Sequence, residues 1–328
     1  MLKEKYIINE FQQKILYKEP TNKIGKLDSD LYRIRMNKKP EKYVSDRKVL
    51  GEYIDNIRAN MGYENKDLSK NIETEEIIIN DIRCRRYKSS DKKSPCIVMI
   101  HGGSFIGGSL EVVENPCKKL AEYIKGSVIS IDYTLAPEKP YPYSITECKS
   151  VCEYLNKNKK DMNISDLYIM GDSAGGNIAI GVTNFCKFIK GLIVYYPVTD
   201  LSLKVYEEIW DENLYDINGD LEAKKCINSL RGSETVMTRL YIQNRENLNY
   251  PLVSPIYRDK ITKALLISAE FDYLRIQAEY FASKFRANVI RYGGVNHAFL
   301  DKIGDLEAAE DSLKEVAKWI ERNEKNEF

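Results

Sequence analysis

The chain has 328 residues, of which 43% are hydrophobic and 30% charged, and its formal net charge at pH 7 is +1. This balance is typical of a globular protein with a sizeable core, and it indicates neither a nucleic-acid partner nor a cationic one. No run approaches the roughly 18 apolar residues of a membrane helix, and no secretory leader is recognisable. We therefore expect a cytoplasmic protein without a membrane span.

Residues 1–70 are polar and rich in charge, and their pattern favours helices over strands. Leu50, Ile54 and Met61 recur at helical spacing after Ser45, a residue type that often caps the N-terminus of a helix. The segment is therefore predicted to contain an amphipathic helix and no strand.

From residue 75 onward, short apolar runs alternate with segments of helical periodicity. The first two runs are separated by a tight Asn80-Asp81 turn and predict a hairpin at an edge of the sheet. The later strands are apolar throughout, which indicates an α/β fold with a mostly parallel central sheet and helices on both faces. The predicted strands are 75–79, 82–87, 96–100, 127–133, 167–170, 192–196, 265–268 and 289–292, and the predicted helices are 116–124, 144–155, 176–188 and 306–322.

One long stretch interrupts this alternation. Between Pro197 and Pro255 the chain holds helical fragments rich in aromatic residues but no strong strand. A connection this long within a compact domain is usually functional. We interpret it as a lid inserted between two core strands.

The pentapeptide Gly171-Asp172-Ser173-Ala174-Gly175 lies between a predicted strand and a predicted helix. A G-x-S-x-G turn between a strand and a helix is the structural motif in which such a serine acts as a nucleophile. The turn lifts the Ser173 hydroxyl out of the sheet and directs the first N–H groups of the helix towards the reacting group. Ser173 is therefore the predicted nucleophile.

A serine nucleophile needs a base to take its proton and a third group to orient that base. The chain has two histidines, and His297 follows the last predicted strand, at the carboxyl edge where active sites collect. The preceding strand ends near two carboxylates, Glu270 and Asp272. The order Ser173, Asp272, His297 is that of α/β-hydrolases, so Asp272 is the predicted acid and His297 the predicted base. We interpret Glu270 as a partly solvated loop residue.

The reaction also needs donors for the oxyanion that develops on the substrate. The sequence His101-Gly102-Gly103-Ser104 follows a buried strand, where one half of such a site belongs, and the N–H of Ala174 would supply the other half. The predicted oxyanion hole therefore consists of Gly102, Gly103 and Ala174. His101 precedes Ser173 in the chain and is expected to hold the loop by hydrogen bonds.

Several motifs together resemble the hormone-sensitive-lipase-like α/β-hydrolases, the bacterial family IV carboxylesterases. They are His101-Gly102-Gly103, the segments 132–138 and 171–177, and Pro251-Leu252-Val253-Ser254-Pro255, together with the segments around Asp272 and His297. The resemblance spans about residues 75–320 and implies an α/β-hydrolase fold with the triad and oxyanion hole named above. It also implies a helical cap formed by 1–70 and 200–250, over a core formed by 71–199 and 251–328.

The chain departs from the family pattern in two places. Ser104 stands where the family usually has a third glycine, which affects the geometry expected for the oxyanion loop. Arg275-Ile276-Gln277 stands where the family often has a second acid, and we expect no effect on the chemistry.

The sequence therefore predicts a serine carboxylesterase that hydrolyses short- to medium-chain esters through an acyl-enzyme on Ser173, without a cofactor or a metal. An amidase or deacylase with the same triad remains the alternative within enzymes, and a non-catalytic small-molecule receptor remains the alternative from another class. The glycine-rich segment 102–108 lacks the spacing of nucleotide-binding motifs, and the two histidines are too far apart for a closed metal site. The partner expected is a small-molecule ester, and a homodimer is possible.

Overall fold

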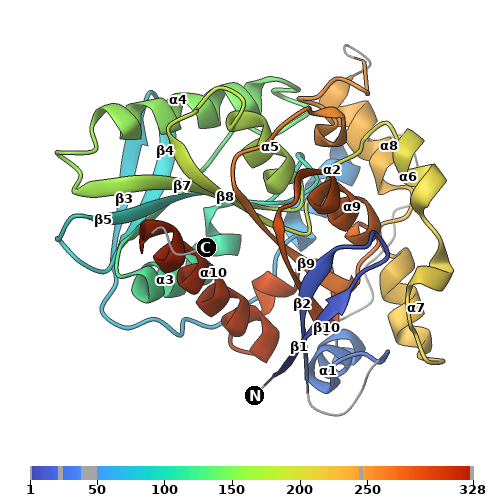
Figure 1. The fold of residues 1–328 in the computed structure, drawn as a ribbon. Helices are drawn as coiled ribbons and strands as arrows, with labels where there is room; N and C mark the ends of the chain where they lie inside the picture. The colour runs from blue at the N-terminus through green and yellow to red at the C-terminus, as the bar shows by residue number, and fades with distance from the viewer. Residues whose placement is uncertain (1, 21–24, 38–49, 244–246, 326–328) are drawn as a thin grey trace.

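The computed structural model describes residues 2–20, 25–37, 50–243 and 247–325. The described residues form one twisted, ten-stranded sheet through the middle of the molecule (Figure 1). Its strands are β1 (Lys3–Ile8), β2 (Lys14–Glu19), β3 (Glu73–Ile79), β4 (Ile82–Lys88), β5 (Ser94–Ile100), β6 (Ser127–Ile131), β7 (Ile164–Asp172), β8 (Ile189–Tyr195), β9 (Ala264–Phe271) and β10 (Asn288–Asn296).

The strands follow the spatial order β1-β2-β10-β9-β8-β7-β5-β6-β4-β3. Strands β5 to β10 pair in parallel, whereas β3 and β4 at one edge pair antiparallel. The central strands are buried almost throughout, because helices cover both faces of a parallel sheet. The predicted α/β fold, its parallel sheet and the edge hairpin β3–β4 are confirmed.

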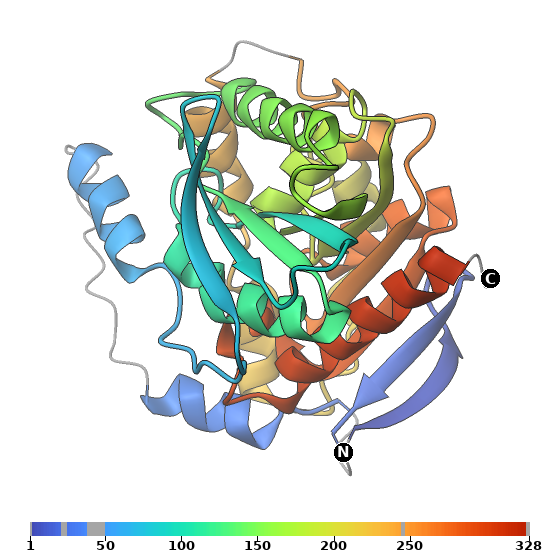
Figure 2. The ribbon, with the colours of Figure 1, turned by 90° about the vertical axis from the view of Figure 1, so that its left-hand side faces the viewer.

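Helices cover both faces of the sheet (Figures 1 and 2). The helices α3 (Leu110–Ile124) and α10 (Glu307–Lys325) pack together on one face, and α4 (Tyr143–Lys157) and α5 (Ala174–Val182) pack together on the other. A further helix, α9 (Arg275–Phe285), contacts β9 and β10 and was not among the predicted helices. Its apolar residues are spread around the helix axis and give little helical periodicity, since the helix is buried on several sides.

The prediction that residues 1–70 contain no strand is wrong. The strands β1 and β2 form an antiparallel hairpin, and β2 continues the sheet by pairing in parallel with β10. The hairpin was missed because β1 is an edge strand whose residues are mostly exposed, so it lacks the apolar alternation of a half-buried strand. The helices α1 (Ser29–Asn37) and α2 (Leu50–Asn60) follow it, and the expected cap residue Ser45 lies outside the described residues.

The segment between β8 and β9 is helical in the part that the structure describes. It lies to one side of the sheet, in yellow and pale orange in Figure 1, and contributes no strand there. Its elements are α6 (Lys204–Ile209), η1 (Glu212–Leu214), α7 (Leu221–Asn228), α8 (Ser233–Met237), the π-helical turn η2 (Thr238–Ile242) and η3 (Pro255–Tyr257).

Candidate active site

Ser173 occupies the sharp turn between β7 and α5. Its φ of 53° and ψ of −119° lie outside the regions that non-glycine residues normally adopt, so the backbone is strained at this residue. Hydrogen bonds on both sides hold the turn: the Ser173 N–H donates to the Tyr195 carbonyl at 2.9 Å, and the Ser173 carbonyl accepts from Val198 N–H at 3.2 Å. The structure thus keeps the serine in a conformation that it would not adopt in a free chain.

The flanking glycines make this turn possible. A Cβ on Gly171 would lie 2.3 Å from the Gly175 carbonyl oxygen, and one on Gly175 would lie 2.1 Å from the Ile100 carbonyl oxygen. Real Cβ atoms do not approach this closely, so any other residue would push β7, α5 and the end of β5 apart. The spacing G-x-S-x-G is therefore a packing requirement as well as a turn signal.

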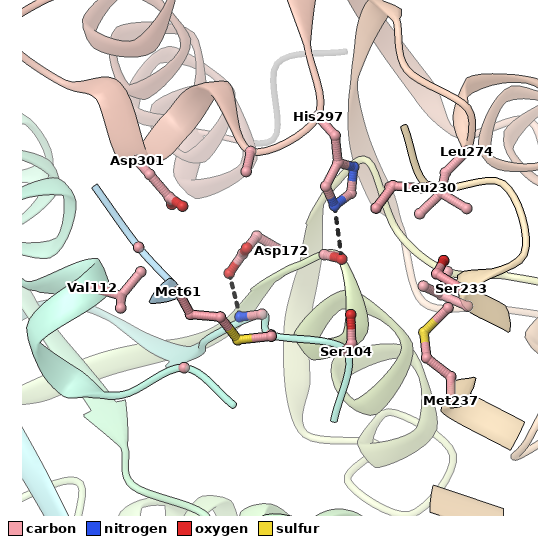
Figure 3. Close-up of a pocket in the computed structure, with 17 residues that line it drawn as sticks. Met61, Ser104, Val112, Asp172, Leu230, Ser233, Met237, Leu274, His297 and Asp301 are labelled. Atoms are coloured by element: carbon pink, nitrogen blue, oxygen red, sulfur yellow. Dashed lines mark hydrogen bonds between the residues drawn. The ribbon is translucent and has the colours of Figure 1, made fainter. Parts of the chain in front are cut away.

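His297 connects the serine to an acid. Its Nε2 lies 2.9 Å from Ser173 Oγ, and its Nδ1 lies 2.7 Å from Asp272 Oδ2. His297 directly follows β10 and Asp272 directly follows β9, so the carboxyl ends of neighbouring parallel strands bring the two together. Figure 3 shows the His297–Ser173 contact as a dashed line. The three residues predicted as a triad are brought together in the expected order of contacts.

Asp272 is fully buried, and several groups hold it in place. Its Oδ1 accepts from the Leu274 N–H at 2.9 Å, which leaves Oδ2 for the imidazole. Its carbonyl oxygen accepts from the Tyr215 hydroxyl at 2.9 Å, a contact from the segment between β8 and β9. Tyr215 was not predicted as a site residue, and the only sequence signal was the aromatic content of that segment.

Opposing effects act on the charge of His297. Burial lowers the pKa of the imidazole, but the Asp272 carboxylate, by its charge and by the hydrogen bond that it accepts, more than offsets this. Asp172 and Asp301 act in the same direction, and the pKa is raised above its ordinary value of 6.5. The site therefore favours an imidazolium, the form that appears when His297 takes the serine proton.

Glu270, interpreted from the sequence as a partly solvated loop residue, is instead buried within β9. It accepts hydrogen bonds from the Tyr17 hydroxyl at 3.0 Å and from the Gly294 N–H at 2.7 Å. Burial raises the pKa of its carboxyl. Glu270 therefore joins the β1–β2 hairpin to the core. The sequence could not predict these contacts, because no strand was predicted before residue 70.

The expectation that Gly102 donates to the oxyanion is corrected by the structure. The Gly102 N–H donates to Asp172 Oδ1 at 2.7 Å, the second dashed line in Figure 3, and is therefore already occupied. The pKa of Asp172 is raised to about 7, mainly by burial and also by the negative charge of the nearby Asp301. This hydrogen bond connects the glycine loop (residues 102–108) to the turn that carries Ser173 (the nucleophile turn), because Asp172 directly precedes the serine.

The backbone N–H groups of Gly103, Ser104 and Ala174 donate to no other group among the described residues. Ala174 is the first residue of α5, so its N–H has no partner within the helix. Gly103 has a φ of 126° and Ser104 a φ of 55°, which turns the loop at the edge of the cavity. The structure thus leaves Gly103 and Ala174 available as predicted, with the Ser104 N–H beside them.

Two side chains support this loop. Arg58 of α2 donates from Nε to the Ile106 carbonyl at 2.7 Å, and sequence reasoning did not find it. His101 is buried, and its Nδ1 lies 2.8 Å from the Gly102 carbonyl. Burial lowers the pKa of His101, so the ring is neutral and Nδ1 must carry the proton that the carbonyl accepts. His101 therefore holds the loop by a hydrogen bond, as expected.

A cavity of about 190 Å³ lies against the Ser173 and His297 side chains (Figure 3). Residues that follow α2 and residues from the glycine loop, α3, the segment between β8 and β9, and the loop after β10 meet around it. They are Met61, Gly62, Gly102, Gly103, Ser104, Gly108, Val112, Asp172, Ser173, Val198, Leu230, Ser233, Met237, Leu274, His297, Ala298 and Asp301.

All seven cysteines are buried free thiols. Within the described ranges, no group of three or more His, Cys, Asp or Glu residues is placed to hold a metal ion. None of the helices described has both the length and the apolar composition needed to cross a membrane.

The fold and the site together define a class of protein, the α/β hydrolases with a serine nucleophile. Residues 97–301 match the alpha/beta hydrolase fold family, and the chain belongs to that family. Within it, the predicted placement among the hormone-sensitive-lipase-like carboxylesterases is confirmed.

The curated relatives include an acetyl esterase of Salmonella typhi, which is 24% identical over 262 residues covering 73% of this chain and 76% of the relative. Among solved structures, an esterase of the archaeon Pyrobaculum calidifontis superposes with a TM-score of 0.70 at 24% identity, covering 90% of this chain and 98% of that one. A thermostable carboxylesterase cloned from a metagenomic library superposes with a TM-score of 0.65 at 22% identity, covering 83% and 94%. At these identities the structural likeness establishes the fold.

Proposed function

We propose that this protein is a serine carboxylesterase that cleaves small esters through an acyl-enzyme on Ser173. The observation that carries the proposal is the bridge made by His297, 2.9 Å from the Ser173 hydroxyl and 2.7 Å from the Asp272 carboxylate. Ester hydrolysis is the activity that the family, the esterase relatives and this geometry support in common.

In the proposed reaction, the Ser173 hydroxyl gives its proton to His297 Nε2 as its oxygen attacks the ester carbonyl carbon. His297 then returns the proton to the leaving alcohol, and the acyl group stays on Ser173. Water then gives a proton to the same nitrogen as its oxygen attacks the acyl carbon. His297 returns this proton to Ser173 Oγ as the bond between the acyl carbon and Oγ breaks, which releases the acid and restores the serine hydroxyl. Asp272 accepts the Nδ1–H throughout, which keeps Nε2 free to accept and stabilises the transient imidazolium.

The oxyanion is proposed to lie against the backbone N–H groups of Gly103 and Ala174, with that of Ser104 as a third donor. Support comes from their lack of other partners, whereas the Gly102 N–H is occupied by Asp172. A donor of this kind typically contributes about 10²–10³ in rate.

The cap is also a proposal. Met61 beside α2 and Leu230, Ser233 and Met237 from the segment between β8 and β9 all line the cavity, which supports a helical cap over the reacting atoms. A cavity of about 190 Å³ with an apolar wall suits short acyl groups. We therefore place the optimum at the short end of the short- to medium-chain range.

The test is hydrolysis of p-nitrophenyl esters from acetate to palmitate by the wild type and by Ser173→Ala. We expect turnover of acetate and butyrate, little turnover beyond octanoate, and a loss of at least about 10⁴-fold in the variant. Ser165→Ala, at the other end of β7 and away from the cavity, is the matched control and keeps wild-type rates.

A folded wild type that is inactive on every ester would contradict the proposal and direct attention to amides or to ligand binding without turnover. A cytoplasmic location and a homodimer stay predictions from the sequence.

A further inference from the structure

The cavity has two chemically different sides. In Figure 3, Asp172 and Asp301 lie on one side of His297, and Leu230, Leu274 and Met237 lie on the other. The triad and the oxyanion loop account for neither Asp301 nor the second oxygen of Asp172. A substrate that fills this cavity therefore meets one apolar side and one side that carries two carboxylates beside Met61 and Val112.

Asp301 lacks the partner that a buried carboxylate normally has. Asp301 lies in η4 (Phe299–Lys302) and lines the cavity. It is only 8% exposed. Its Oδ1 is buried and has no hydrogen-bond partner within the described ranges. Most buried polar atoms are hydrogen-bonded, so an unpartnered acceptor at the edge of a cavity indicates a donor that the ligand supplies.

Asp172 strengthens this acidic side. It is 5% exposed, and its Oδ1 accepts a hydrogen bond from the Gly102 N–H. The neighbouring Lys302 donates to the Ala298 carbonyl at 2.7 Å and lowers the pKa of Asp301 by its charge, but it does not line the cavity. Among the residues that line it, His297 is the one side chain able to carry positive charge.

The electrostatics favour a cation over a neutral donor. Burial raises the pKa of Asp301 to about 6, and burial together with Asp301 raises that of Asp172 to about 7. Near neutral pH the pair therefore carries negative charge, and the opposite charges of His297 and Lys302 do not outweigh the effect of burial on it. A protonated amine brings both the missing N–H donor and the opposite charge, whereas a hydroxyl brings only the donor.

We propose that Asp301 and Asp172 form a cation-binding subsite, so that the preferred substrates are small esters carrying a protonated amine. This inference rests on the proposed esterase function and specifies its substrate class. Asp301 is then a specificity-determining residue, because it contacts the substrate away from the reacting carbonyl.

The test compares esters that differ only in charge. 2-(Dimethylamino)ethyl acetate, protonated at pH 7, is matched by 3-methylbutyl acetate, and β-alanine ethyl ester is matched by ethyl butanoate. The first pair places the cation in the alcohol and the second in the acyl group. We expect kcat/KM to favour the cationic member by about tenfold in at least one pair, as for a hydrogen bond to a charged group.

Asp301→Asn keeps the shape of the side chain and removes its charge, so it should reduce that ratio to about one. Asp166→Asn, at the opposite end of β7 and outside the cavity, makes the same change in net charge and should keep the wild-type ratio. A thermal melt of each variant establishes that it is folded. If Asp301→Asn does not fold, the proposal is judged by the wild-type ratio of kcat/KM between the cationic and the neutral ester of each pair.

The proposal is overturned if neither cationic ester is preferred by the wild type, or if the preference survives in a folded Asp301→Asn variant. It is also overturned if 2-hydroxyethyl acetate is preferred to propyl acetate while no cation is, which would assign the subsite to hydroxyl-bearing esters. Failure of the esterase function itself looks different, since the neutral esters would then not be hydrolysed either.

Discussion

At the scale of single residues, two neighbouring carboxylates have opposite roles. Asp272 is held by the Leu274 N–H so that its other oxygen faces His297, whereas Glu270, two residues earlier, points to Tyr17 and Gly294. Alternation along a strand would send residues two apart to the same face of the sheet, so the difference arises at the end of β9, which includes Glu270 but not Asp272.

Replacing each acid separates these roles. Asp272→Asn should lower kcat by about 10⁴-fold, because the amide stabilises the wrong imidazole tautomer and carries no charge. Glu270→Gln should change kcat by less than about tenfold, since the amide keeps an acceptor and burial already favours the neutral acid. Steady-state rates on an acetate ester measure both, and equal losses in the two folded variants would contradict the assignment.

The pH dependence of activity follows from His297. The base accepts a proton only when it is neutral, and its pKa is raised above 6.5, so kcat/KM should fall on acidification with an inflection above that value. Initial rates measured from pH 5 to 9 on one acetate ester test this. A flat profile, or an inflection below pH 6, would exclude the contacts described for the imidazole.

At the scale of elements, the site depends on close packing between the ends of β5, β7 and α5. Gly175 lies where the α5 backbone approaches the Ile100 and His101 carbonyl groups, so the nucleophile turn and the oxyanion loop share one contact. A shift of either element therefore moves both halves of the oxyanion hole.

Gly175→Ala tests this coupling. The new Cβ would lie 2.1 Å from the Ile100 carbonyl oxygen, so we expect a loss of about 1–3 kcal/mol in unfolding free energy and at least a tenfold loss of activity. Gly219→Ala is the control: its φ of 74° adds backbone strain, but no atom lies within 4 Å of its Cβ. A melt and a rate measurement on each should show activity lost only in Gly175→Ala.

At the scale of the whole molecule, the N-terminal hairpin is joined to the strands that carry the triad. Glu10, between β1 and β2, forms ion pairs with Arg275 at 2.7 Å and with Arg291 at 2.6 Å. Arg275 begins the helix after Asp272, and Arg291 lies on the strand that leads to His297. The hairpin therefore supports the base and the acid from outside the catalytic core.

Glu10→Gln should lower the free energy of unfolding by about 2 kcal/mol, because two buried arginines each lose a charged hydrogen-bond partner while Arg291 keeps Glu279. Burial raises the pKa of Glu10, but Arg275 and Arg291 more than offset this and lower it from 4.5 to about 2. A lowered carboxyl pKa stabilises the fold at pH values above 4.5, and this contribution is lost as the pH falls from 4.5 towards 2. Chemical denaturation at pH 7 and pH 3 measures the difference.

Glu4→Gln is the control on the same hairpin, since Glu4 is 63% exposed and pairs with Lys18 at 3.6 Å. Glu4 is exposed and Lys18 keeps Asp311 and Glu315 as partners, so the unfolding free energy should stay within about 1 kcal/mol of the wild type. Equal effects of the two substitutions would mean that the Glu10 ion pairs do not carry the stabilisation.

The chemistry of the site that depends on the local order of residues could be predicted from the sequence. The turn around Ser173, the positions of Asp272 and His297 after successive strands, and the parallel sheet all follow from short-range patterns. These features are visible because each rests on a strand end or a tight turn, where few residue types fit.

Which polar groups face one another depends on how the chain packs. The fold places Asp172 on the Gly102 N–H and buries Glu270 against Tyr17, and Asp301 Oδ1 has no hydrogen-bond partner among the residues that the structure describes. Such contacts join residues far apart in the chain, and their partners are set by packing rather than by periodicity. For the same reason the exposed edge strand β1 left no apolar pattern, although the sheet extends through it.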